Sequence, residues 1–319
     1  MLIGIFLLLS GIYLGLIRAG YKFPGISISF NHSVIMIFGF LGTLISLERA
    51  VAIKKGWIYL SPVLFSLGSI LSLFQRELLL IGVLASFILA FAFFYLIKIY
   101  GFRFQWFVMA LGAILLGMGG ILYVLGFNIN FVLGFWFSSL ILTIGAERWE
   151  LSVMFVKRKG RNFTFFVIVL FMCLVSATPY DILKGISFLL MALWLLYYDV
   201  AVFNIKGRGL VRFVAINLLA GYIWLLVGGL GWMFSLPYDL KIHSITLGFV
   251  FGMIFAHAPI IFPSIMGKKS SYSSMLYIPF LLLHLSLIIR SFADIKLGSL
   301  LNAISIILYL AILRFKVIV

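Results

Sequence analysis

Four histidines stand in or beside apolar runs of helix length, and the spacing of two of them favours metal chemistry. His243 and His257 are 14 residues apart in one such run. At about 100° and 1.5 Å per residue, 14 steps return to nearly the same helix face about 21 Å further along the axis. Histidines placed in this way suit two haems stacked across a membrane, each held by an imidazole nitrogen.

The other two histidines supply candidate partners for these ligands. His32 and His243 each follow the outer start of an apolar run, and the two runs have the same predicted direction. We therefore expect His32 and His243 to share an outer iron. His257 and His284 lie on consecutive antiparallel runs and are expected to hold an inner iron, although residue counting puts them about 7 Å apart in depth. The alternative is that these rings only hydrogen-bond to neighbours or lie at the headgroup level.

Paired charges form a second polar layer, near the inner ends of the predicted spans, whereas His32 and His243 lie near the outer ends. Glu48 and Arg49 follow each other at the end of one apolar run, and Glu147 and Arg148 do so in another. The simplest interpretation is structural pairing, because an unpaired charge in an apolar medium is costly. The functional alternative is that Arg49 and Arg148 bind haem propionates while Glu48 or Glu147 accepts the proton released when quinol is oxidised.

Small and aromatic residues surround the histidines in two of the runs. Glycines at these positions would let a macrocycle approach the backbone, with close packing of helices as the alternative; they are Gly39, Gly42, Gly248 and Gly252. The pairs His32-Ser33 and His243-Ser244 are also followed by phenylalanines at identical offsets, namely Phe38 and Phe40, and Phe249 and Phe251. This repetition, whether a relic of duplication or chance in a Phe-rich chain, hints that His32 and His243 face one another.

The elements that must position these residues are membrane-spanning helices. Hydrophobic residues make up 65% of the chain and charged residues 10%, which excludes a soluble globular protein. Breaks at charged or Pro/Gly-rich positions predict an all-α polytopic bundle of twelve spans in a single membrane domain, residues 1–319. The predicted spans are 2–17, 30–52, 57–74, 78–97, 104–126, 129–153, 162–178, 183–203, 211–235, 240–262, 274–291 and 297–315.

The charge distribution predicts the orientation. With an even number of spans, 17 of the 24 lysines and arginines fall on the side of the termini. By the positive-inside rule, both termini are then cytoplasmic, in a multi-pass protein of the cell membrane. The net charge of +16 is spread over many short loops, which fits contact with anionic lipid and not with nucleic acid. The single cysteine, Cys173, excludes an internal disulfide and any multi-cysteine metal site.

Several segments resemble known membrane haem proteins. The runs 32–50 (HSVIMIFGFLGTLISLERA) and 243–259 (HSITLGFVFGMIFAHAP), with 146–152 (AERWELS) and 283–286 (LHLS), are similar to the NnrS family of haem- and copper-containing proteins. The chain also resembles the hydrophobic (CbsB-like) subunit of the cytochrome b complex of thermoacidophilic archaea. The second resemblance implies a hetero-oligomer with a haem-bearing subunit outside the cell, and the first implies haem and copper in this chain.

These observations predict the integral subunit of a b-type cytochrome, which would pass electrons from quinol to an outer-surface acceptor. Such a chain is an electron-transfer subunit and not a stand-alone enzyme. Haem b is the expected cofactor, with copper as the alternative. Two other functions stay open: an NnrS-like haem–copper protein of nitrogen-oxide metabolism, and a secondary transporter that uses histidines and glutamates as proton relays.

Overall fold

The computed structural model describes residues 2–22, 32–268 and 272–317, and every regular element in these ranges is helical. The predicted all-α class is therefore confirmed. Helices follow from composition, because only internally hydrogen-bonded backbone is tolerated in a lipid environment. By internal contacts, the chain divides into two compact units, Met1–Ala146 with Ser176–Pro179, and Glu147–Val175 with Tyr180–Val319. Since α7 contributes to both units, a single membrane domain remains a prediction.

The first unit contains the helices up to the middle of α7. Among them, α2, a π-helical segment and α3 form one continuous helix, and short 3-10 turns precede α4 and α5. The elements are α1 (Leu2–Arg18), α2 (His32–Val34), the π-helical segment Ile35–Gly42, α3 (Thr43–Ile53), α4 (Leu60–Leu71), α5 (Leu79–Tyr100), α6 (Phe104–Val124) and α7 (Ile129–Phe155).

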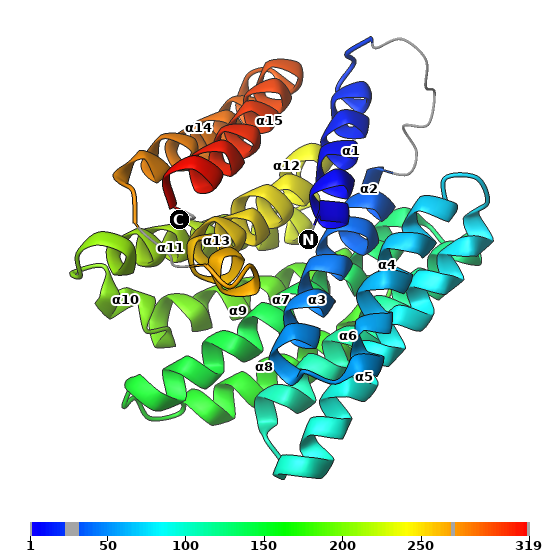
Figure 1. Ribbon diagram of the computed structural model, residues 1–319, viewed down its shortest axis with the longest axis vertical. Coiled ribbons are helices and arrows are strands. Elements are labelled where there is room, and N and C mark those ends of the chain that lie inside the picture. The colour runs from blue at the N-terminus through cyan, green and yellow to red at the C-terminus, as the bar shows by residue number, and fades with distance from the viewer. Residues whose placement is uncertain (1, 23–31, 269–271, 318–319) are drawn as a thin grey trace. The chain divides into compact units, whose positions relative to one another are not determined.

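The second unit contains the remaining helices. Its neighbours α14 and α15 lie side by side (Figure 1), as α9 and α11 do. The elements are α8 (Arg161–Ser176), α9 (Asp181–Tyr198), α10 (Ala201–Asn204), α11 (Gly209–Met233), α12 (Tyr238–His243), the π-helical segment Ser244–Val250, α13 (Phe251–Ile265), α14 (Tyr277–Phe292), α15 (Ile295–Ile312) and the π-helical segment Leu313–Val317.

Each predicted span overlaps a helix in the described part of the chain. Nine of these helices are long and apolar enough to cross a membrane. Three apolar helices are shorter, namely Leu2–Arg18, Gly56–Leu71 and Arg161–Ser176. The structure thus supports a polytopic membrane protein, while the count of twelve crossings remains a prediction.

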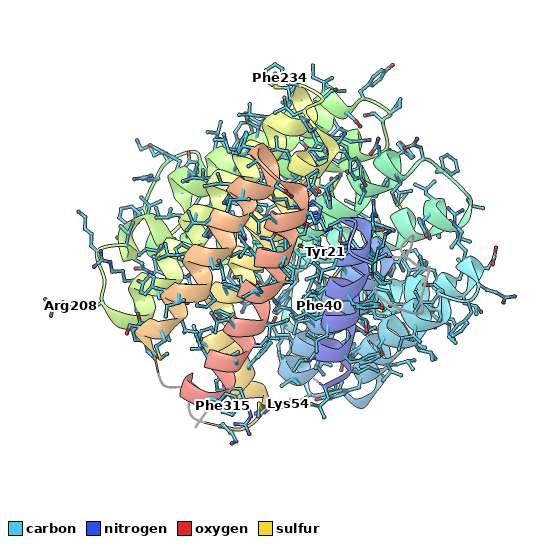
Figure 2. The ribbon with its side chains drawn as sticks, turned by 90° about the horizontal axis from the view of Figure 1, so that it is seen from above. Tyr21, Phe40, Lys54, Arg208, Phe234 and Phe315 are labelled. Carbon is cyan, nitrogen blue, oxygen red and sulfur yellow. The ribbon has the colours of Figure 1, made fainter. Side chains whose placement is uncertain are left out.

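Large aromatic side chains fill the interior of each unit. In the first unit, the Phe38 ring lies 5.9 Å from that of Phe65 and 5.6 Å from that of Trp136, and all three are fully buried. In the second, the rings of Phe255 and Tyr309 stack at 3.8 Å. The residues that flank α11, Arg208 and Phe234, are exposed instead (Figure 2).

The helices that carry His32 and His243 share an unusual feature. In the first, the π-helical segment Ile35–Gly42 begins three residues after His32. In the second, the π-helical segment Ser244–Val250 begins directly after His243. Insertions of this kind in α-helices are frequent at functional sites. The repeated His-Ser-Phe-Phe pattern of the sequence therefore coincides with a repeated backbone geometry.

Candidate functional site

His32 is held by the preceding helix. Its Nδ1 atom lies 2.8 Å from the main-chain oxygen of Gly11 on α1. A carbonyl oxygen only accepts hydrogen bonds, so Nδ1 carries the proton and the lone pair is on Nε2. Metal-binding histidines are oriented in this way, with the other ring nitrogen donating to a carbonyl or carboxylate.

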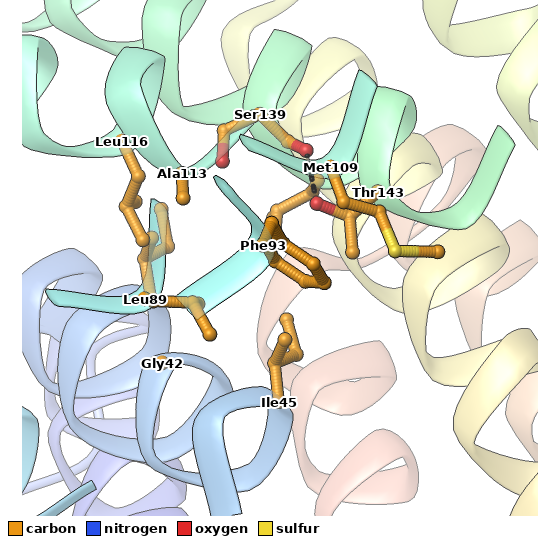
Figure 3. A pocket seen from close by; sticks show the side chains of 11 residues that line it. Gly42, Ile45, Leu89, Phe93, Met109, Ala113, Leu116, Ser139 and Thr143 are labelled. Carbon is orange, nitrogen blue, oxygen red and sulfur yellow. Dashed lines mark hydrogen bonds between the residues drawn. The ribbon is translucent and has the colours of Figure 1, made fainter. Parts of the chain in front are cut away.

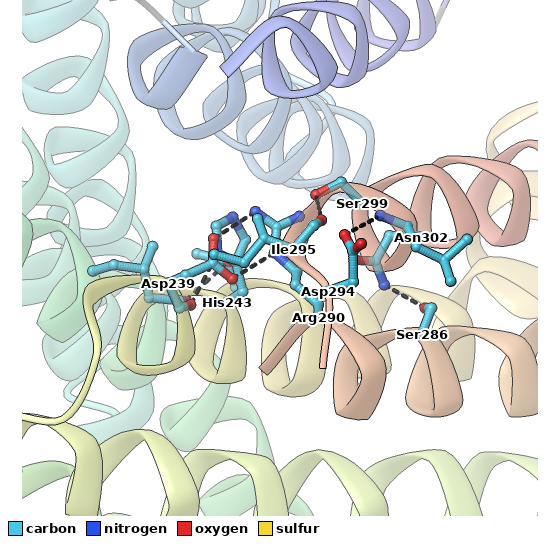
Figure 4. A network of polar contacts seen from close by, with 11 residues as sticks. Asp239, His243, Ser286, Arg290, Asp294, Ile295, Ser299 and Asn302 are labelled. Carbon is cyan, nitrogen blue, oxygen red and sulfur yellow. Dashed lines mark hydrogen bonds and ion pairs between the residues drawn. The ribbon is translucent and has the colours of Figure 1, made fainter. Parts of the chain in front are cut away.

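His243 is oriented by a carboxylate that is itself held by an arginine. The Nδ1 atom lies 3.0 Å from the main-chain oxygen of Asp239 and 3.2 Å from its carboxylate. From α14, Arg290 donates two hydrogen bonds of 2.7 Å to the same carboxylate (Figure 4). A histidine backed by a carboxylate is a common arrangement behind a metal ligand, since it fixes the ring and raises its basicity.

His257 has the same protonation pattern within its own helix. Its Nδ1 atom lies 2.8 Å from the main-chain oxygen of Met253, one turn earlier in α13. This bond again places the proton on Nδ1 and the lone pair on Nε2. Three of the four histidines therefore donate through Nδ1, which in the neutral ring leaves the lone pair on Nε2 that a ligand to iron needs.

His284 is in the opposite tautomer. The indole nitrogen of Trp224, which can only donate, lies 2.9 Å from His284 Nδ1. The neutral ring then carries its proton on Nε2, which is buried and has no hydrogen-bond partner. The Phe280 ring packs edge-on at 4.5 Å. Ligation of an inner iron through Nε2 would require this ring to change its tautomer and give up the bond from Trp224.

The predicted sharing of iron between histidines stays a prediction. His32 belongs to the first unit and His243 to the second, whereas His257 and His284 both belong to the second. Within the described residues, no group of three or more histidine, cysteine, aspartate or glutamate side chains could hold a metal ion. A haem iron needs no such group, because the porphyrin supplies four of its ligands.

The second charged layer contains a buried ion pair that the sequence did not predict. Arg148 donates to Asp199 through Nε at 2.7 Å and Nη2 at 2.8 Å, and the two side chains are 5% and 0% exposed. The Arg148 charge is therefore neutralised, which fits structural pairing and not the binding of a propionate. Arg49 lies 3.5 Å from Glu48, and both are partly exposed. Glu147 is partly buried on α7.

Three of the basic residues that the charge count assigned to the outer side lie in helices and pair with acidic side chains. Lys184 and Lys241 place their Nζ atoms 3.5 Å and 3.6 Å from the two carboxylate oxygens of Asp181. The Lys241 ammonium also lies 4.7 Å from the centre of the buried Trp232 ring. Arg290 is the third. Lys269, counted on the cytoplasmic side, lies outside the described residues.

The glycines near the histidines serve helix packing. A Cβ atom at Gly42 would lie 2.7 Å from the Phe65 ring, and one at Gly248 would lie 2.4 Å from Trp224. At Gly39 and Gly252 the nearest neighbouring atoms are 3.2 Å and 3.4 Å away. Neighbouring helices already occupy these positions, which favours the helix-packing alternative, while the approach of a macrocycle stays a prediction.

The phenylalanines of the repeated pattern are also part of the packed interior. Their exposed fractions are 4% or less, for Phe38, Phe40, Phe249 and Phe251. A small cavity in the first unit lies beside the π-helical segment, between Leu89, Phe93 and Met109 and the polar pair Ser139 and Thr143 (Figure 3). None of the four histidines lines this cavity.

Sequence reasoning missed the residues that orient the histidines. Asp239 could have been found, because it precedes His243 by four residues and so shares its helix face. Arg290, Trp224 and Asp199 come from other parts of the chain, and only the packing of the helices brings them to their partners.

The fold and the site together define a class, the polytopic α-helical membrane proteins with partly buried histidines and paired charges in their helices. The chain belongs to the family described as domain of unknown function DUF8744, whose model matches residues 1–318. No curated protein and no solved structure matched the chain.

Proposed function

We propose that this chain is the integral-membrane subunit of a b-type cytochrome complex that passes electrons from the quinol pool to an outer-surface acceptor. The observation that supports the proposal is the shared tautomer of His32, His243 and His257, which leaves a lone pair on each Nε2. Bis-imidazole ligation of haem b needs this state. Bis-imidazole ligation takes two donors per iron, so His32 and His243 would supply both donors of an outer haem, whereas His257 supplies one donor of an inner haem when His284 is left out.

The residues of the chain then have distinct roles. His32, His243 and His257 would hold iron, and haem b would supply a one-electron redox centre. Asp239 and Arg290 keep the His243 ring in place. Glu48, which is partly exposed beside Arg49, is the first candidate to accept a proton from quinol, and Glu147 is the second. The complex would lie in the cell membrane with cytoplasmic termini and an extracytoplasmic haem-bearing partner subunit.

Difference spectra of the purified chain test the proposal. After expression with haem supplied, dithionite reduction is expected to give the α-band of a low-spin haem b. His243→Ala should abolish the band of the haem that it ligates, whereas His284→Gln should keep every band if the bond from Trp224 holds His284 in its present tautomer. A colourless wild-type chain, purified both alone and with copurifying subunits, would rule the proposal out.

One structural feature favours a second candidate, the proton-coupled secondary transporter. Two histidine-bearing helices, one in each unit, are interrupted by π-helical segments. Transporters often place broken helices at their substrate sites, and a π-helical segment is a smaller departure from regular α-helical geometry. Proton-driven uptake of a solute into liposomes by a chain without a chromophore would support this candidate. Copper found by metal analysis would instead support the haem–copper alternative.

A further inference from the structure

We propose that Gly15 on α1 is the positioning residue for His32, because its missing side chain makes the space in which the imidazole lies. This inference rests on the proposed ligand role of His32, but the positioning itself can be measured without haem. It gives α1, which carries no candidate ligand, a second role in the site beside that of the Gly11 carbonyl oxygen.

The close approach of the ring to the backbone carries the proposal. A Cβ atom at Gly15 would lie 2.9 Å from Cε1, 3.3 Å from Nδ1 and 3.6 Å from Nε2 of His32. One edge of the imidazole ring therefore packs directly against the α1 backbone at Gly15. A contact of 2.9 Å between carbon atoms is far inside van der Waals distance, so any side chain at this position must displace the ring.

Displacement would also remove the control over the tautomer. The ring reaches the carbonyl oxygen of Gly11, one turn before Gly15, with a hydrogen bond of 2.8 Å. That bond keeps the proton on Nδ1 and the lone pair on Nε2. If the ring moves away from α1, the bond lengthens and the preference for this tautomer is lost.

The same helix provides a matched control. At Gly4 of α1, an added Cβ atom would meet no atom within 4 Å. Gly4→Ala and Gly15→Ala make the same chemical change in the same apolar helix, and each should gain similarly in intrinsic helix propensity. Any difference between the two variants then reports the contact with His32.

Solid-state NMR of the chain labelled with ¹⁵N in its histidine rings tests the positioning directly. With four histidines in the chain, we expect three rings protonated on Nδ1 and one, His284, protonated on Nε2. His32→Gln identifies the signal of His32. In Gly15→Ala this signal should shift towards the other tautomer, while the remaining three rings stay unchanged and show that the variant is folded. Gly4→Ala should match the wild type.

Haem binding by the same variants separates this inference from the proposed function. Gly15→Ala should bind haem about 10-fold to 100-fold more weakly, the usual effect of losing a group that orients a metal ligand. If the wild-type chain binds no haem but the His32 signal still shifts in Gly15→Ala, the positioning stands and the haem proposal fails. If wild type and Gly15→Ala give the same His32 signal, the inference is overturned.

Discussion

At the scale of single residues, the clearest feature is the pairing of charges that the helices bury. Arg148 and Asp199 share two hydrogen bonds, and the carboxylate of Asp199 also accepts the Ala201 amide at 2.6 Å, at the start of α10. Asp199 thus has both a charge-pairing role and a capping role. A buried pair adds little by comparison with apolar packing, but the loss of one partner leaves a charge that nothing solvates.

We expect Asp199→Asn to destabilise the chain by about 3–5 kcal/mol, the usual range for breaking a buried ion pair. The asparagine keeps one oxygen for the Ala201 amide and for one Arg148 donor, so the loss reports the charge together with the second hydrogen bond from Arg148. Thermal unfolding in detergent measures the effect. As a control, Glu48→Gln alters a partly exposed pair and should cost less than about 1 kcal/mol. Equal unfolding of Asp199→Asn and wild type would contradict the role given to this pair.

The same residues show what could and could not be predicted from the sequence. Helical spans were predictable because an apolar run has only one way to satisfy its backbone in lipid. The ligand tautomers and charge partners were not, because they depend on which helices are neighbours. Arg148 and Asp199 are 51 residues apart, as are Asp239 and Arg290. No local pattern encodes such a contact.

At the scale of elements, the π-helical segments carry glycines where they contact neighbouring helices. In the second unit, Gly248 in the segment Ser244–Val250 faces Trp224 on α11, whose indole donates to His284 on α14. The geometry of this one segment therefore affects two neighbouring helices. Gly252, one turn later, makes only ordinary contacts.

Gly248→Ala should lower stability by about 1–3 kcal/mol, as overpacking of an interior does. The added carbon would lie 2.4 Å from both Cβ and Cγ of Trp224, and these atoms next to the backbone have little freedom to move. Gly252→Ala is the matched change and should be neutral or slightly stabilising, because alanine favours a helix. Thermal unfolding compares the two, and similar melting temperatures would contradict the close approach of Trp224.

At the scale of the whole molecule, the open question is the direction in which the chain crosses the membrane. The excess of basic residues in alternate loops predicts cytoplasmic termini. Lys184, Lys241 and Arg290 weaken the opposing signal further, because they pair with acidic residues inside helices. Orientation then depends on the loops that carry exposed lysine and arginine.

Labelling of introduced cysteines checks this orientation, and the single native cysteine makes a clean background possible. In a Cys173→Ser chain, Lys55→Cys is expected to resist a membrane-impermeant maleimide in intact cells, whereas Glu77→Cys should react. Both positions are exposed in the structure. In lysed cells, both should react. The reverse pattern in intact cells would place the termini outside.

The lysine pair around Asp181 has a consequence for biogenesis. Asp181 and Lys184 are one turn apart on α9, so their opposite charges can pair as soon as this helix has been synthesised. The later helix that begins with α12 carries Lys241, whose partner Asp181 lies on α9. It also carries Asp239, whose partner Arg290 lies on α14. Without those neighbours, Lys241 would lack its carboxylate and Asp239 would have only His243 of the same helix beside it. Its integration is therefore expected to wait at the translocon for both neighbours, so that these three helices enter the lipid together.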